Sequence, residues 1–196
     1  MPRGPSRGAG ADAFVLAHEI VHVTTRAKPE LATRLYRELG FEPIEPLAWP
    51  QEWLPARISN PDAPHSRHAM RVETPAGQQW LVPLLVASRT QLKPGETFFS
   101  VLQVRLLAVE PGRAGQPSLP LRRAGQLQWW RVEDVPAYLQ RLGGNTEYVF
   151  HPEETLADNI ALLASGASAP NPALLDRLRS VLADYARLPF TRKDKP

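Results

Sequence analysis

The pentapeptide HEIVH, residues 18–22, constrains this chain more than any other stretch of it. His18 and His22 are four positions apart, just over one helical turn, so on an α-helix both imidazoles project from the same face. Two imidazoles at this spacing can bind one tetrahedral Zn²⁺, and Glu19 then lies beside the metal where a water ligand would sit. The pentapeptide therefore predicts a helix and is typical of zinc-dependent hydrolases.

Apolar residues surround the pentapeptide and predict a helix from residue 11 to about residue 25. The apolar set consists of Ala13, Phe14, Val15, Leu16, Ala17, Ile20, Val21 and Val23. We expect such a helix to be buried. Because buried polar side chains need partners, two histidines and a glutamate in these surroundings indicate a binding site.

A zinc hydrolase of this kind needs a third protein ligand, and the sequence excludes two of its known sources. In metzincins a third His lies six residues after the second His, with a Gly between them, but this chain has Thr25 and Lys28 at those positions. Deformylases with a similar helix use a cysteine ligand, and this chain has no cysteine. A carboxylate from a later helix remains as the candidate for the third ligand.

Residues 151–159, HPEETLADN, have the features of such a helix. Pro152 suits a first helical turn, and acidic residues suit its positive N-terminal end. Glu154 and Asp158 are four positions apart and share one face. The pentapeptide HEIVH followed by this E-x-x-x-D pair resembles the gluzincin clan of zinc metallopeptidases, to which thermolysin belongs.

The resemblance implies a zincin-like α+β fold, Zn²⁺ as the cofactor and a peptide or protein as the substrate. The metal ligands that it implies are His18, His22 and Glu154. It also makes Glu19 the general base and Asp158 the residue that orients His18. Glu153 competes with Glu154 for the role of ligand, but on a helix it points about 100° away and lacks a partner at the Asp158 spacing.

Two further side chains are candidates for stabilising the oxyanion that forms in amide hydrolysis, namely Tyr148 and His151. His151 can also hydrogen-bond the site or replace Glu154 as a ligand. The leading hypothesis is a zinc-dependent peptidase or amide hydrolase that uses a metal-activated water and a Glu base. The alternatives are a catalytically inactive zincin-like module for zinc binding or interaction, and a coincidental occurrence of the motifs.

The long interval between the two motif helices predicts a β-rich insertion at about residues 65–132. Alternating patterns and turn signals predict strands at 68–73, 79–87, 98–109 and 127–132, with spacings that suit an antiparallel meander. The Pro-rich stretch 41–64 is expected to be loop with short extended pieces. In it, Trp49 and Trp53 are expected to cap the core, and His65 and His68 beyond it to lie on the surface.

Helices are also predicted at residues 29–39, 132–142, 152–164 and 174–185, the last packed on the core. The resulting organisation is a mobile tail (1–9), a zincin-like domain (10–165), a linker with the C-terminal helix (166–190) and a charged tail (191–196). Basic residues number 23 against 20 acidic ones without a basic run, which argues against a nucleic-acid partner. No apolar run approaches a membrane span and no export signal is visible, so we expect a cytoplasmic protein.

Overall fold

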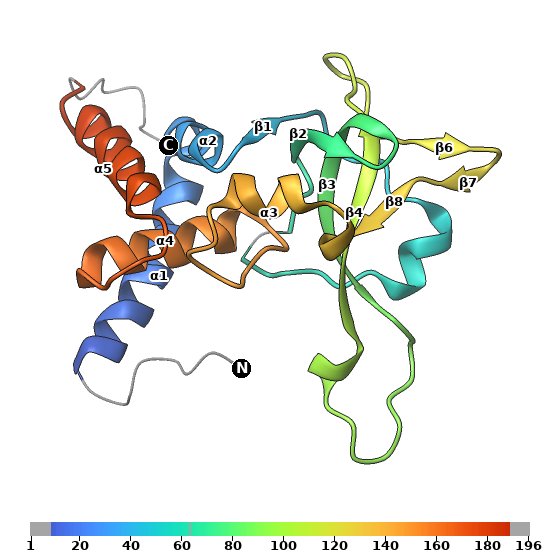
Figure 1. Ribbon diagram of the computed structural model, residues 1–196, viewed down its shortest axis with the longest axis horizontal. Coiled ribbons are helices and arrows are strands. Elements are labelled where there is room, and N and C mark those ends of the chain that lie inside the picture. The colour runs from blue at the N-terminus through green and yellow to red at the C-terminus, as the bar shows by residue number, and fades with distance from the viewer. Residues whose placement is uncertain (1–8, 63, 189–196) are drawn as a thin grey trace.

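The computed structural model describes residues 9–62 and 64–188 and has an α+β architecture. A helical layer contains α1 (Ala9–Ala27), α2 (Pro29–Glu38), α4 (Pro152–Ser165) and α5 (Pro172–Ala186), and it lies beside an antiparallel, curled sheet. The short α3 (Pro136–Leu142) lies between the two (Figure 1). The two predicted tails lie outside the described residues, apart from Ala9, which begins α1.

The sheet contains the predicted antiparallel meander and two short strands that were not predicted. Its order is β1 (Phe41–Pro43), β2 (His68–Thr74), β3 (Gly77–Ala87) and β4 (Leu102–Glu110). Two short strands, β5 (Leu119–Pro120) and β8 (Trp129–Arg131), pair with different parts of β4, and β6 (Arg122–Arg123) with β7 (Gln126–Leu127) forms a separate hairpin. The sequence did not predict β1, which has only three residues and is held by its pairing with β2.

Three predicted elements differ from the structure. The strand expected at 127–132 is divided, with Leu127 in β7 and Trp129–Arg131 forming β8. The strand expected at 98–109 starts at Leu102, because the register with β3 ends at the Ala87–Leu102 pair and residues Phe98–Val101 form a 3₁₀ turn. The helix expected at 132–142 is interrupted at Val135, whose φ and ψ are −127° and 74°. Pro136 explains the break, since a proline keeps the preceding residue out of the helical region.

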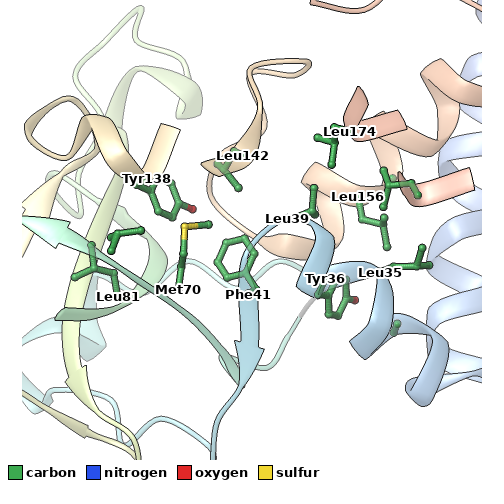
Figure 2. Close-up of a cluster of buried hydrophobic side chains, with 14 of the residues drawn as sticks. Leu35, Tyr36, Leu39, Phe41, Met70, Leu81, Tyr138, Leu142, Leu156 and Leu174 are labelled. Atoms are coloured by element: carbon green, nitrogen blue, oxygen red, sulfur yellow. The ribbon is translucent and has the colours of Figure 1, made fainter. Parts of the chain in front are cut away.

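The main core joins the helical layer to the sheet (Figure 2). Leu39 at the C-terminal end of α2, just beyond its last residue, is fully buried, as are Phe41 of β1, Met70 of β2, Tyr138 of α3 and Leu156 of α4. Most positions in the first half of α4 are buried, because α4 packs against α1, α2 and α5. This central place of α4 fixes its N-terminal acidic residues relative to α1.

The prediction that α1 is buried was wrong. Its apolar side chains Val15, Leu16, Ile20 and Val23 are 58, 62, 53 and 67% exposed. The reason is that α1 packs on α4 and α2 along one side, while no described element covers the opposite side. Within the described ranges, no helix combines the length and the apolar character that crossing a bilayer requires.

Candidate metal centre

The packing of α1 against α4 brings His18, His22 and Glu154 together. Nε2 of His18 lies 3.3 Å from Oε2 of Glu154, and Nε2 of His22 lies 3.9 Å from the same oxygen. One potential ligand atom from each residue lies within 4.8 Å of the others. Among residues 9–62 and 64–188, this is the only group of three or more His, Asp or Glu side chains that is arranged to hold a metal ion.

The donor set fits a divalent cation such as Zn²⁺. A tetrahedral zinc ion with bonds of about 2.1 Å places its ligand atoms about 3.4 Å apart. The observed separations of 3.3 and 3.9 Å lie close to this value. Two imidazole nitrogens and one carboxylate oxygen are also ligands that zinc prefers, and they leave a fourth position for water or substrate.

The imidazole of His18 is oriented by Asp158. Nδ1 of His18 lies 2.9 Å from Oδ1 of Asp158, and the other Asp158 oxygen accepts a 2.5 Å hydrogen bond from the Thr146 hydroxyl. The hydrogen bonds to Asp158 and then to Glu154 raise the pKa of His18 to about 10 in the absence of metal. Because the Asp158 carboxylate accepts a hydrogen bond from the Nδ1–H group, Nε2 is directed to the metal position.

The imidazole of His22 has its own carboxylate partner, which sequence reasoning missed. Nδ1 of His22 lies 2.8 Å from Oε1 of Glu153, and that oxygen also accepts a 2.6 Å hydrogen bond from the Thr25 hydroxyl. The Tyr36 hydroxyl donates to the other Glu153 oxygen. From the sequence, Glu153 was expected only to compete with Glu154 for the role of ligand. A signal was available, since each ligating histidine needs an acceptor for its second nitrogen and Glu153 is the adjacent acid.

The second oxygen of Glu154 is held by a residue outside both motifs. Nδ2 of Asn60 donates a 2.6 Å hydrogen bond to Oε1 of Glu154. Asn60 lies between β1 and β2, in the stretch that was predicted only as a Pro-rich loop. No sequence pattern connected it with the metal ligands.

A cleft of about 530 Å³ opens beside the three ligands. Glu19 is exposed and lines it, as does Tyr148, whose ring centroid lies 6.4 Å from that of His18. Burial, and then the carboxylates of Asp158 and Glu154, raise the pKa of Tyr148, so its hydroxyl is a donor at neutral pH. Much of the remaining wall is apolar and comes from loops, β3 and β4: Ile58, Leu85, Phe98, Phe99, Leu102, Val104 and Phe150.

The structure does not bring His151 to the metal ligands. Its Nδ1 caps α4 by accepting from the backbone N–H of Glu153 at 3.1 Å, and its Nε2 faces the carbonyl oxygen of His65 at 3.4 Å. The imidazole does not line the cleft beside the ligands. Burial lowers its pKa, which keeps the ring neutral and able to accept in the cap.

The structure also tests the positions predicted for two tryptophans and two histidines outside the metal centre. Trp53 is buried in a second apolar cluster, and Trp49 packs against this cluster, so both cap the core as predicted. His65 is exposed, as expected. His68, which was expected on the surface, is only partly exposed, because its ring packs edge-on against Tyr36 at 4.7 Å between centroids.

Comparisons of this chain with known protein families, with curated proteins and with solved structures found no match. What the centre does is therefore inferred from its own geometry.

Proposed function

We propose that the protein is a zinc-dependent hydrolase of peptide or related amide bonds. The observation that carries this proposal is the convergence of His18 Nε2, His22 Nε2 and Glu154 Oε2 at the edge of a cleft that Glu19 also lines. Three ligands with an open fourth position are the pattern of catalytic zinc sites, whereas structural zinc sites have four protein ligands.

The residues around the ligands have complementary roles in this reaction. Bound Zn²⁺ would supply a Lewis acid that lowers the pKa of a water molecule and polarises the substrate carbonyl. Glu19, exposed in the cleft, accepts the proton of the attacking water and passes it to the leaving amine. Tyr148 lines the same cleft, and its protonated hydroxyl would donate to the carbonyl oxygen as negative charge develops there.

The edge of β4 supports an extended peptide as the substrate. Ala108 directs its N–H and C=O away from β3, toward Gln128 and Leu121, so by alternation Leu102 and Val104 do the same. The pairing of β4 with β8 stops at Arg105, and no strand in the described part of the chain pairs with β4 beyond it on this side. Because Leu102 and Val104 also line the cleft, an extended chain can add to this edge next to the metal ligands.

These features favour a gluzincin-like enzyme in which the strands of the sheet come between the two motif helices in the sequence. Leu102 and Val104 of β4 line the cleft, so we assign β4 the role of a substrate-binding edge strand. The apolar cleft wall favours substrates with an apolar side chain next to the cleaved bond.

A pair of variants tests the proposal. Glu19→Gln should retain one zinc per chain but lose cleavage of a pool of internally quenched peptides, since the base is lost and the ligands remain. His22→Ala should lose both the zinc and the cleavage. Glu30→Gln serves as the matched control, because Glu30 is exposed on α2 and does not line the cleft.

Full cleavage by both Glu19→Gln and His22→Ala would refute the proposed mechanism. A wild-type chain that binds one zinc and cleaves none of the peptides would favour the alternative, a zinc-binding interaction module. The exposed apolar side of α1 is the observation that supports this alternative.

A further inference from the structure

The two oxygens of Glu154 have different neighbours. Oε2 faces the two imidazoles, 3.3 Å from His18 Nε2 and 3.9 Å from His22 Nε2. Oε1 instead accepts a 2.6 Å hydrogen bond from Nδ2 of Asn60. The carboxylate is therefore held in one rotation, with a single oxygen directed at the metal position.

The orientation of the Asn60 amide is fixed by its own loop. Its Oδ1 accepts a 3.0 Å hydrogen bond from the backbone N–H of Asp62, so the amide nitrogen has to face Glu154. The loop is attached to the molecule on both sides of Asn60. On one side the Ile58 N–H donates to the Leu85 carbonyl of β3 at 3.1 Å, and on the other Asp62 pairs with Arg26 of α1 at 2.9 Å.

This arrangement matters because a carboxylate can bind a cation through one or both oxygens. With two imidazoles present, binding through both Glu154 oxygens would occupy the position that a catalytic zinc site keeps open. We propose that Asn60 is a positioning residue that restricts Glu154 to binding through Oε2 alone, and so preserves the open position. This inference rests on the metal site of the proposed function and adds a determinant of its coordination number.

The cobalt-substituted protein tests the inference, because the visible d–d absorption of Co²⁺ weakens as its coordination number rises above four. We expect Asn60→Ala to bind one Co²⁺ per chain with weaker d–d absorption than the wild-type protein. In the zinc form its peptide cleavage should fall roughly 10–100-fold, the usual cost of losing a partner of a metal ligand.

Two further variants separate the effect of the hydrogen bond from Asn60 to Glu154 from any effect of a changed loop conformation. Asn60→Ser keeps a side-chain oxygen for the Asp62 N–H but is too short to reach Glu154, so it should behave like Asn60→Ala. Ser59→Ala changes the neighbouring cleft residue and should keep the wild-type spectrum.

The outcomes distinguish this inference from the proposed function. Wild-type d–d absorption in both Asn60 variants would overturn the inference and leave the proposed metal site intact. Failure of both variants to bind Co²⁺ at saturation would also overturn it, since Asn60 would then determine binding rather than its mode. Absence of Co²⁺ binding by the wild-type protein would overturn the metal site and the inference together.

Discussion

The two imidazoles of the candidate metal centre are supported to different extents. The His22 arm consists of His22, Glu153, Thr25 and Tyr36, and its histidine and carboxylate side chains are only 3 and 4% exposed. The His18 arm consists of His18, Asp158 and Thr146, and its histidine and carboxylate are 15 and 13% exposed. The Glu153 carboxylate accepts from three side chains, whereas that of Asp158 accepts from two.

This difference indicates that the two arms have different roles. The His22 arm lies between α1, α2 and α4, so it contributes to the packing of the helical layer as well as to the metal centre. The His18 arm borders the cleft, where Tyr148 lies beside it. We therefore expect changes in the His22 arm to reduce stability most, and changes in the His18 arm to affect mainly metal binding and catalysis.

The largest effect is expected for Glu153→Ala in the metal-free protein. The substitution leaves His22, Thr25 and Tyr36 without their acceptor in a buried site, which should lower the free energy of unfolding by about 4 kcal/mol. Asp158→Ala, the matched change in the His18 arm, should cost less than half as much. Urea denaturation in the presence of a chelator measures the unfolding free energy of both variants. Equal losses would contradict the larger contribution of the His22 arm to stability.

A pH dependence should follow from His68, whose ring packs against Tyr36 at the back of the His22 arm. Burial, more than any neighbouring charge, lowers the pKa of His68 from 6.5 to about 4. Below pH 6.5 His68 binds a proton in the unfolded chain but not in the folded protein. Stability is therefore lost as the pH falls from about 6.5 to about 4. The loss from this group should reach up to about 3 kcal/mol, since one pKa unit corresponds to about 1.4 kcal/mol.

Comparison of the wild-type protein with His68→Gln isolates this effect from the other titrating groups. The unfolding free energy of the variant, measured with chelator across pH 4 to 7, should fall less steeply than that of the wild-type protein. Identical slopes would show that the folded state does not exclude the His68 proton.

In the His18 arm, Asp158→Asn should weaken zinc binding by roughly 10–100-fold, as is usual when the carboxylate partner of a ligating histidine is replaced. Its effect on stability should stay below about 1 kcal/mol, because an amide of the same shape still accepts from His18. Competition with a chromogenic chelator measures the affinity. An unchanged zinc affinity would mean that Asp158 does not orient His18.

The smallest effect is expected for Tyr36→Phe. Glu153 keeps two of its three donors in this variant, so the unfolding free energy should fall by only about 1–2 kcal/mol. Zinc affinity should change little. A large loss of zinc affinity with unchanged stability would reverse the roles assigned to Tyr36 and to the His22 arm.

Local sequence patterns predicted the parts of the centre that are close together in the chain. The four-residue spacing placed His18 with His22 and Glu154 with Asp158, and strand periodicity predicted the meander between them. The partners supplied by tertiary packing were not predictable in this way. Tyr36 reaches Glu153 because α2 packs beside α1, and Asn60 reaches Glu154 because its loop is attached to β3.

The exposure of α1 was not predictable either, because an apolar helix pattern shows which residues can be buried but not whether another element covers them. Val15, Leu16, Ile20 and Val23 fit the pattern of a buried helix and are nevertheless exposed.

The most direct test of the central claim is an anomalous difference map, recorded at the zinc edge, from crystals of the full chain grown with zinc. We predict one strong peak about 2.0–2.2 Å from His18 Nε2, His22 Nε2 and Glu154 Oε2, with a separate oxygen in the fourth position. A map from zinc-saturated crystals with no peak among these three atoms would contradict the claim that they form a metal centre.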